Sequence, residues 1–202
     1  MKAIVLYSGG KDSSLVAHFL KQWGYEVLLV TANFGVMPEC IETAQKAAES
    51  IGFPFEPITL DSKTIEEAAD QAQKDGFPLN AINIAHHAAL EGICAKYKDT
   101  YKLITDGTRR DDKTPRLTLA EMQSLEDRHK IEYSPILCGL SYKTIKYLTD
   151  AIFLTESVQA GSIPTSEYET EIRATLRARG DGLEKDIFPE NHYHTIVKGY
   201  KK

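Results

Sequence analysis

A short glycine-rich loop between an apolar run and a helical pattern is the feature that most constrains this chain. Residues 3–7 read Ala-Ile-Val-Leu-Tyr, which is too apolar for a strand with one face in water. Residues 13–23 repeat apolar side chains at helical spacing, and Gly24 follows as a stop signal. A buried strand, a tight polar loop and a helix in this order begin a βαβ unit. The chain is therefore expected to build a parallel sheet.

The rest of the chain continues this alternation. Further apolar runs that are typical of strands cover residues 25–31, 55–60, 101–105 and 132–137. Helical patterns cover residues 38–51, 61–74, 79–97, 118–129, 141–153 and 167–177, and residues 192–197 alternate as in an edge strand. This order predicts an α/β fold, a doubly wound five-stranded parallel sheet in three layers, as in Rossmann-like proteins. Such sheets bind ligands at the carboxyl ends of their strands.

Length and composition fit one domain. Of the 202 residues, 42% are hydrophobic and 26% charged, which is ordinary for a globular protein. No apolar run approaches the roughly 18 residues of a membrane helix, and the N-terminus lacks the pattern of a signal peptide. Three cysteines without a CxxC pair predict neither a disulfide framework nor a four-cysteine zinc site. We therefore expect a soluble cytoplasmic protein that does not bind a membrane.

The loop has the composition of a phosphate cradle. It reads Ser8-Gly9-Gly10-Lys11-Asp12-Ser13-Ser14. Two glycines let the backbone curl so that N–H groups approach an anion, and the helix N-terminus adds the positive end of its dipole. The serines supply hydroxyl donors, and Lys11 supplies a positive charge. The alternative is a plain glycine-rich turn with a serine cap, which needs fewer of these residues.

The same string resembles the PP-loop of the N-type ATP pyrophosphatases, a superfamily with the adenine nucleotide alpha hydrolase-like (HUP) fold. It is not a Walker A loop, because Asp12 follows the lysine where that motif has Ser or Thr. The resemblance implies that ATP and Mg²⁺ bind here, and that a substrate oxygen attacks the α-phosphorus to give an adenylate and pyrophosphate. It assigns the leaving pyrophosphate to Ser8, Gly9, Gly10, Lys11, Ser13 and Ser14. Asp12 is expected to organise the loop or a metal-bound water.

The resemblance also points to residues after the second strand. Ala32, Asn33 and Phe34 occupy the place where family members recognise adenine through backbone groups. The alternative at this position is a simple turn from strand to helix, ending in Gly35.

A third segment follows the fourth strand and reads Asp106-Gly107-Thr108-Arg109-Arg110-Asp111-Asp112. It partly matches a G-H-x-x-D-D pattern found in PP-loop tRNA enzymes, with Thr108 where the histidine would stand. The resemblance makes Asp106, Gly107, Thr108, Arg109 and Arg110 candidates for binding ATP. The residues that it makes candidates for catalysis are Lys11, Asp12, Asp111 and Asp112.

Charge is unevenly distributed along the chain. A net charge of −5 and a pI of about 5.7 exclude a uniformly basic surface for nucleic acid. A local basic stretch remains, at Arg109, Arg110, Lys113 and Arg116. Its cations are predicted to contact phosphates of ATP or of a nucleic acid. The alternative is a solvated loop whose Asp–Arg pairs have little energetic value.

Other residues carry weaker functional interpretations. Cys138 follows the fifth strand, and thiolating family members carry sulfur on a cysteine, but a small buried side chain is the favoured interpretation. His192 and His194 could bind a metal with a third ligand that the sequence does not identify; polar residues of an edge strand are favoured instead. We therefore assign no metal ligands. Of His86 and His87 in one helix, we expect one to pack and the other to be exposed.

The sequence predicts an ATP-dependent enzyme that adenylates a substrate and releases AMP and pyrophosphate, with tRNA as a candidate acceptor. A small-molecule amidating or ligating enzyme and a non-catalytic module that binds ATP or AMP are the alternatives. Residues 1–160 are expected to form the PP-loop domain, and residues 161–202 a helix-and-strand appendage packed on it. Because this leaves little room for a substrate domain, the acceptor is expected to be recognised by loops, the tail or a second subunit, such as a homodimer partner.

Overall fold

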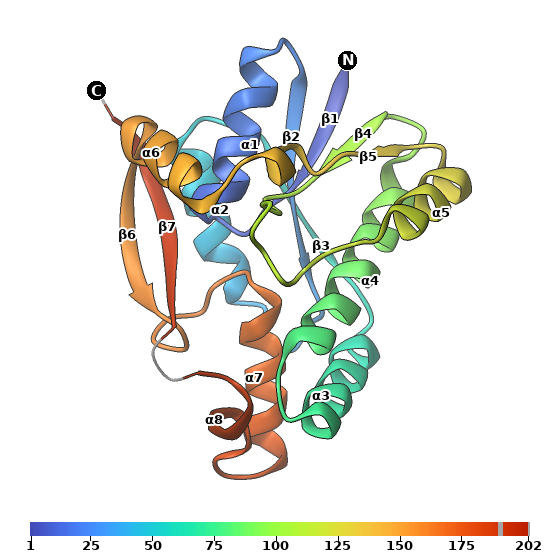
Figure 1. The fold of residues 1–202 in the computed structure, drawn as a ribbon, viewed down its shortest axis with the longest axis vertical. Helices are drawn as coiled ribbons and strands as arrows, with labels where there is room; N and C mark the ends of the chain where they lie inside the picture. The colour runs from blue at the N-terminus through green and yellow to red at the C-terminus, as the bar shows by residue number, and fades with distance from the viewer. Residues whose placement is uncertain (190–191, 202) are drawn as a thin grey trace.

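Five parallel strands form the main sheet of the computed structural model, which describes residues 1–189 and 192–201 (Figure 1). The strands are β1 (Lys2–Leu6), β2 (Glu26–Asn33), β3 (Phe55–Thr59), β4 (Leu103–Thr105) and β5 (Glu132–Tyr133). Their order is β3-β2-β1-β4-β5, so the chain reverses direction across the sheet between β1 and β4. The predicted doubly wound five-stranded fold is confirmed. Its switch point lies at the ends of β1 and β4, where such sheets bind ligands.

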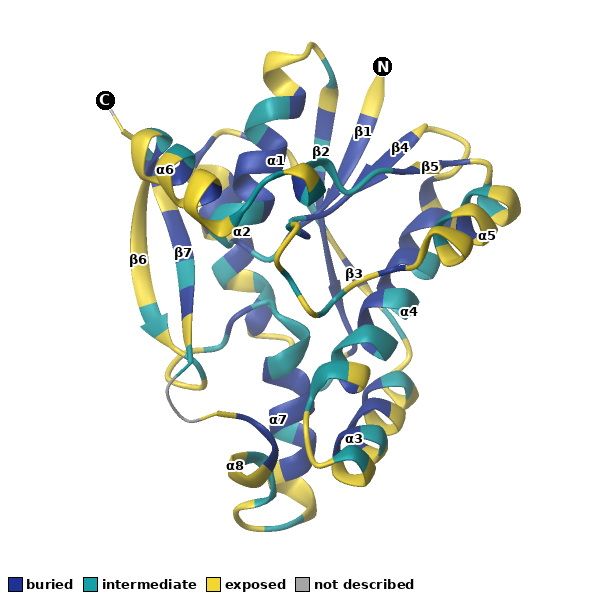
Figure 2. Cartoon of the chain, viewed as in Figure 1, coloured by how far each residue is buried: buried dark blue, intermediate teal, exposed yellow. Residues whose placement is uncertain are grey.

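Helices cover both faces of this sheet (Figure 2). They are α1 (Lys11–Gln22), α2 (Cys40–Ser50), α3 (Lys63–Asp75), α4 (Leu79–Tyr97), α5 (Leu119–His129) and α6 (Tyr142–Ile152). Alternate side chains of β1 point to opposite faces: Ala3 and Val5 pack with α1 and α2, whereas Ile4 and Leu6 pack with α4 and α5. All four are buried, as the apolar run at residues 3–7 predicts for a strand covered on both faces.

Two C-terminal helices extend the layer that contains α3 and α4 (Figure 1). They are α7 (Tyr168–Arg179) and α8 (Leu183–Ile187). Ile172 and Leu176 of α7 share a core with Ile65 of α3 and with Phe34, which follows β2. This packing brings the start of α7 to the carboxyl edge of the sheet. Among residues 1–189 and 192–201, no helix is both long enough and apolar enough to cross a membrane.

A separate antiparallel sheet combines β6 (Phe153–Gln159) and β7 (Tyr193–Tyr200). The two strands lie on either side of the proposed division at residue 160, so both segments contribute to one sheet. The backbone N–H of Val197 in β7 donates to the carbonyl oxygen of Gly9 over 3.0 Å, and Ile196 forms a bridge with Gly10. The tail strand therefore contacts the loop after β1 directly.

The structure corrects two predicted boundaries. The helix expected to run to Phe153 ends at Ile152, and Phe153 begins β6 because its ring stacks on Tyr200, with 5.3 Å between centroids. The strand expected over residues 132–137 is reduced to Glu132 and Tyr133. Pro135 has no N–H to donate to a neighbouring strand, and a short 3₁₀ helix, η1 (Ile136–Gly139), follows it.

Phe153 should anchor the β6–β7 sheet to the main core. Phe153 is 1% exposed, whereas Leu154 is 50% exposed. We expect Phe153→Ala to lower the free energy of unfolding by about 3 kcal/mol, because it removes buried apolar contacts and leaves a cavity. The control, Leu154→Ala, should change this free energy by no more than about 0.5 kcal/mol. Urea denaturation followed by circular dichroism measures both, and equal effects would contradict the proposed anchor.

Candidate functional site

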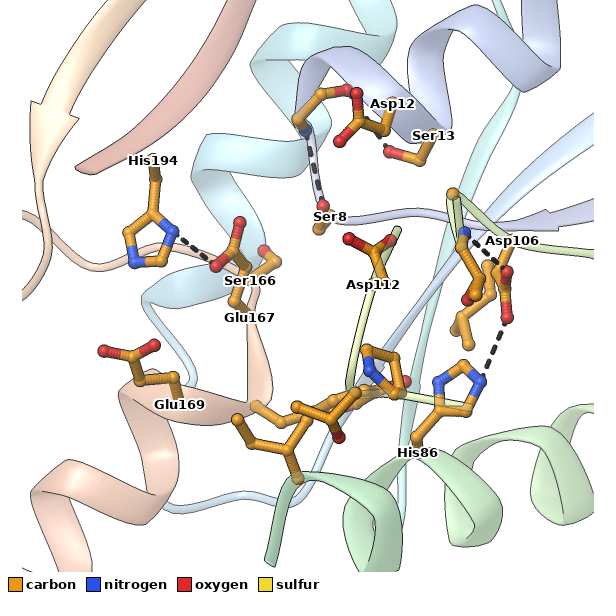
Figure 3. A pocket seen from close by; sticks show the side chains of 18 of the residues that line it. Ser8, Asp12, Ser13, His86, Asp106, Asp112, Ser166, Glu167, Glu169 and His194 are labelled. Carbon is orange, nitrogen blue, oxygen red and sulfur yellow. Dashed lines mark hydrogen bonds and ion pairs between the residues drawn. The ribbon is translucent and has the colours of Figure 1, made fainter. Parts of the chain in front are cut away.

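A cavity of about 460 Å³ opens at the carboxyl ends of β1 and β4 (Figure 3). This volume is typical of small-molecule sites. Most of the residues that line the cavity come from the β1–α1 loop, the segment after β4, the first half of α4, the start of α7 and the start of β7. Its position agrees with the rule that ligands bind at the switch point of an open α/β sheet.

The β1–α1 loop presents an anion-binding surface to this cavity. Because α1 begins at Lys11, its first backbone N–H groups have no acceptor within the helix, and the positive end of its dipole faces the same way. The loop residues that line the cavity are Ser8, Gly10, Lys11, Asp12 and Ser13. Backbone donors, hydroxyl groups and one lysine thus converge on a single wall.

The remaining loop residues, Gly9 and Ser14, hold the loop in shape. Gly9 has a φ of +82°, and a Cβ there would lie 3.1 Å from the Cα of Ala44 in α2. Only glycine combines that backbone conformation with so close an approach. Ser14 is fully buried; its Oγ donates to the carbonyl oxygen of Gly10 over 2.8 Å and lies 3.0 Å from the hydroxyl of Tyr7. Neither residue lines the cavity.

Two cations and two carboxylates alternate along the same wall. Lys11 Nζ lies 3.1 Å from Asp12 Oδ1, and Arg109 Nη1 lies 3.6 Å from Asp12 Oδ2. Arg109 Nη2 lies 2.5 Å from Asp112 Oδ1. Burial lowers the pKa of Arg109, but Asp112 and Asp12 raise it by more, so the guanidinium stays charged. The four side chains are largely shielded from water, which strengthens their interactions with one another and with any charged ligand.

The segment after β4 divides between the cavity and the surface. Asp106, Gly107, Thr108, Arg109 and Asp112 line the cavity. Arg110 and Asp111 do not: they are exposed and pair with each other at 2.9 Å, and Asp111 also accepts the backbone N–H of Tyr142 over 3.0 Å. Of the two aspartates predicted to be catalytic in this segment, Asp112 lies at the cavity wall and Asp111 lies outside the cavity.

A buried polar cluster around Asp106 holds the segment after β4 in place. Asp106 Oδ2 lies 3.0 Å from His86 Nε2, on α4, and accepts the hydroxyl of Tyr133 over 2.6 Å. Its other oxygen accepts the backbone N–H of Thr108 over 2.8 Å. Burial alone would raise the pKa of Asp106, but its contacts with His86, Tyr133 and Thr108 lower it to about 2. The carboxylate is thus held in its charged form at the cavity wall.

Sequence reasoning missed His86 as a site residue. It is 1% exposed and lines the cavity, whereas His87 is partly exposed, so the expected difference between the two is present. Leu79 and Ile82 line the cavity from the same helix. The spacing of these three residues, three and then four positions apart, places them on one helix face and is a signal that the sequence contains. This spacing does not indicate which part of the chain, or which cavity, the helix face contacts.

The segment after β2 is arranged differently from the expectation. Ala32 lines the cavity, but Phe34 is fully buried in the core beside α7. Asn33 turns away: its side chain donates to the carbonyl oxygen of Met37 over 3.1 Å. The buried carboxylate of Glu171, on α7, accepts the backbone N–H groups of residues 34 and 36, each over 3.1 Å. Of the backbone groups predicted to meet adenine, the N–H of Phe34 is thus already hydrogen-bonded within the protein.

The wall opposite the β1–α1 loop combines apolar and polar groups that the sequence did not bring together. Leu79 and Ile82 of α4, with Tyr168 of α7, form its apolar part. Its polar part consists of Ser166, Glu167, Glu169, His192 and His194. Tyr168 is half-buried, and its ring meets those of Phe34 and His86 edge-on, with 6.2 and 5.9 Å between centroids. A planar apolar group fits against the first part, and a cation against the second.

Cys138 does not line the cavity. Its Sγ lies 3.8 Å from the carbonyl oxygen of Thr108, behind the segment that follows β4. Burial and then the charge of Asp106 raise the pKa of its thiol. A thiol with a raised pKa is a poor nucleophile at neutral pH, which favours the packing interpretation of this residue.

Comparison with known proteins relates the whole chain to one family. Residues 1–199 match the model of a family of unknown function, DUF7411. The chain belongs to this family. It is 45% identical over 202 residues to uncharacterized protein MJ0690 of Methanocaldococcus jannaschii, covering 100% of this chain and 98% of that protein. A crystal structure of a predicted subunit of tRNA methyltransferase from the same organism is 42% identical, with a TM-score of 0.90, and covers 100% of this chain and 98% of that one.

Shorter matches connect the chain to a wider group. It is 49% identical over 68 residues to 7-cyano-7-deazaguanine synthase of Nitratiruptor sp., which covers 33% of this chain and 27% of that protein. Such partial similarities relate the chain to the PP-loop superfamily, as residues 8–14 predict.

The low pKa of Asp106 gives stability a specific pH dependence. Its folded pKa of about 2 lies below the unfolded value of about 3.9, so the ionised carboxylate stabilises the fold above about pH 4. That contribution is lost as the pH falls from about 4 to 2. We expect the free energy of unfolding of the wild type to fall by about 2 kcal/mol more over this range than that of Asp106→Asn. Urea denaturation at a series of pH values measures the difference.

The control for this measurement is Asp127→Asn, because Asp127 is an exposed aspartate on α5. This variant should keep the pH dependence of the wild type. If Asp106→Asn also keeps it, the carboxylate of Asp106 is not held as described.

Proposed function

We propose that the chain binds ATP in this cavity and uses it to adenylate an acceptor, with release of pyrophosphate. The observation that carries the proposal is the position of the β1–α1 loop, of which Ser8, Gly10, Lys11, Asp12 and Ser13 line the cavity at the N-terminus of α1. Unpaired helix N–H groups, the helix dipole and Lys11 together provide what a chain of phosphates requires. The relation to the PP-loop superfamily supports the same reaction class.

The charged wall suits the leaving pyrophosphate. Negative charge grows on the leaving phosphates during such a transfer, and preorganised cations that meet it are the main catalytic contribution. Lys11 and Arg109 lie beside each other along this wall, each in contact with Asp12. Their carboxylate partners hold the two cations in place, so little rearrangement is needed when the phosphates bind.

The same carboxylates fit Mg²⁺. This ion takes oxygen ligands and commonly bridges one or two carboxylates to substrate phosphates. Asp12 and Asp112 face the cavity, and Asp12 Oδ1 is buried and accepts no hydrogen bond, although Lys11 Nζ lies 3.1 Å away. When bound, Mg²⁺ would neutralise charge on the phosphate oxygens. We assign its binding to Asp12 and Asp112.

We place the adenine ring against the apolar part of the opposite wall. Leu79, Ile82 and Tyr168 offer an apolar surface there, whereas the backbone donors after β2 are bound to Glu171. Burial of a flat apolar ring against these side chains would supply binding free energy without a polar partner for each ring nitrogen.

We propose tRNA as the acceptor, working with a partner protein. The similar crystal structure is described as a predicted subunit of tRNA methyltransferase, and a subunit implies a partner. In this chain, Arg110, Lys113 and Arg116 are exposed beside the cavity. Exposed cations at the edge of a site are suited to phosphates of a nucleic acid backbone. A homodimer or a second protein would provide the remaining contact surface.

The nucleotide reaction can be tested directly. Incubated with α-labelled ATP, Mg²⁺ and total tRNA, the chain should release one pyrophosphate for each adenylate formed, and the label should appear as AMP when water or another nucleophile displaces it from the acceptor. We expect Lys11→Ala to reduce the rate about 100-fold or more, because it removes a cation from the site of developing charge. Thin-layer chromatography and a coupled pyrophosphate assay provide the measurement.

The control for Lys11→Ala is Lys46→Ala, since Lys46 is an exposed lysine on α2 that pairs with Glu42. This variant should keep the rate of the wild type. Formation of ADP in place of AMP, or equal rates for the two variants, would contradict the proposal.

The acceptor has its own test. Binding of total tRNA should weaken steeply as salt rises, because neutralising phosphates releases counterions. Replacing Arg110, Lys113 and Arg116 together by alanine should reduce the slope of log K against log salt by about 2 to 3, at about one unit for each lost phosphate contact. Fluorescence anisotropy of labelled tRNA at several salt concentrations measures the slopes.

A matched triple variant replaces Lys46, Lys63 and Lys74, three exposed lysines on α2 and α3, outside the cavity. It should keep the slope of the wild type. Equal losses in the two triple variants would point to non-specific attraction. If AMP forms without any tRNA binding, the acceptor is a small molecule instead.

A further inference from the structure

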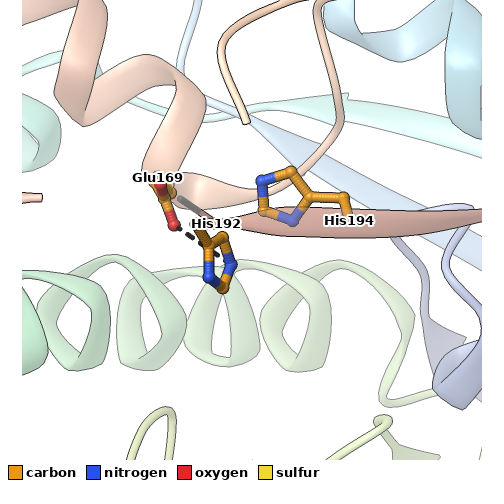
Figure 4. Close-up of side chains that lie close together, drawn as sticks. All are labelled: Glu169, His192 and His194. Atoms are coloured by element: carbon orange, nitrogen blue, oxygen red, sulfur yellow. Dashed lines mark ion pairs between the residues drawn. The ribbon is translucent and has the colours of Figure 1, made fainter. Parts of the chain in front are cut away.

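Three side chains of metal-ligand type converge on the cavity wall that faces the β1–α1 loop (Figure 4). Glu169 comes from the first turn of α7, His192 precedes β7, and His194 lies within β7. One potential ligand atom from each lies within 4.8 Å of the others. Ligands of a tetrahedral zinc ion are about 3.3 Å apart, given metal–ligand distances of about 2.0–2.1 Å. Small side-chain rotations would therefore close the set on an ion.

Two neighbouring side chains, Glu167 and Arg173, already orient two of these ligands. His194 Nδ1 lies 2.5 Å from Glu167 Oε2, which leaves Nε2 for a metal. Glu169 Oε1 accepts from Arg173 Nε over 2.7 Å, while Oε2 faces His192 Nε2 at 3.8 Å. A carboxylate on the far nitrogen of a metal-binding histidine is a recurrent second contact, because it fixes the ring and makes the ligand more basic.

Burial and charge at this cluster also suit a cation. The side chains of Glu169 and His194 are 12% and 5% exposed, and that of His192 is 45% exposed. Glu167 and Glu169 contribute two negative charges, against one positive charge from Arg173. Partly buried negative charge attracts a divalent cation more strongly than an exposed carboxylate would.

We propose that Glu169, His192 and His194 bind one transition-metal ion, with Zn²⁺ as the expected occupant. Two imidazoles and a carboxylate suit zinc, whereas Mg²⁺ prefers oxygen ligands alone. Three protein ligands leave a fourth position open, as in catalytic zinc sites. Because the cluster lines the cavity, that position faces the space in which we place ATP and its acceptor. This metal is distinct from the Mg²⁺ assigned to Asp12 and Asp112.

The site would also connect metal binding to the phosphate loop. His194 is two residues from Ile196, which bridges Gly10, and three from Val197, which donates to Gly9. An ion held by His194 and by α7 would therefore fix the start of β7 against the loop after β1. Zinc binding should accordingly stabilise both walls of the cavity.

Zinc binding to the full chain, produced without a histidine tag and treated with a chelator, tests the proposal. Competition with a chromogenic chelator should give one Zn²⁺ per chain in the absence of nucleotide, so the result does not depend on the proposed ATP reaction. His194→Ala and Glu169→Gln should each weaken binding at least about tenfold. Glu167→Gln should weaken it by about 10- to 100-fold, as expected for a residue that orients a ligand.

The control is His129→Ala, because His129 also contacts a carboxylate, Glu91, at 2.6 Å but lies outside the cavity. This variant should bind zinc like the wild type. Circular dichroism confirms that each variant is folded. Absence of stoichiometric zinc in the wild type, or equal weakening by His129→Ala and Glu169→Gln, would overturn the site.

Discussion

The close approach of three backbone segments to the β1–α1 loop is the constraint on which the rest of the structure depends. Gly9 lets the loop lie against α2, where a side chain would meet the Cα of Ala44 at 3.1 Å. Gly107 does the same for the segment after β4, since a Cβ there would lie 2.9 Å from the backbone nitrogen of Ser13. β7 closes the third side through its hydrogen bond to Gly9. Because no side chain separates these segments from the loop, they approach it closely and form adjacent walls of the cavity.

The main sheet could be predicted from sequence because its central strands are buried on both faces. The apolar runs that form β1 and β2 are compatible with few other structures. The glycine-rich loop after β1 further indicates that a helix connects the two strands. The predicted elements differ from the observed ones where the local hydrophobic pattern is weak. After Phe153, β6 is mostly exposed, so its residues show no alternation, and its pairing with β7 depends on residues about forty positions away. The second residue after Tyr133, a proline, ends β5 early.

The candidate site divides in the same way. Residues that directly follow β1 and β4 could be proposed from sequence, because the fold class alone brings strand ends together. The partners from α4, α7 and β7 could not, since no local pattern states that His86 meets Asp106 or that Glu169 approaches His192. The sequence indicates His192 and His194 as possible metal ligands, but Glu169, the proposed third ligand, lies more than twenty residues earlier in the chain. No sequence pattern likewise indicated the role of Glu171, whose carboxylate accepts hydrogen bonds from backbone N–H groups after β2.

The two walls of the cavity differ in chemical hardness, and this separates their functions. Carboxylates, hydroxyls and backbone N–H groups form the wall at α1, which suits phosphate and Mg²⁺. Two imidazoles and two carboxylates form the polar wall at β7, which suits a transition metal. An ion of either kind would bind poorly at the other wall. A ligand that reaches both walls would therefore meet phosphate chemistry at the wall at α1 and, with the proposed ion bound, a Lewis acid at the wall at β7.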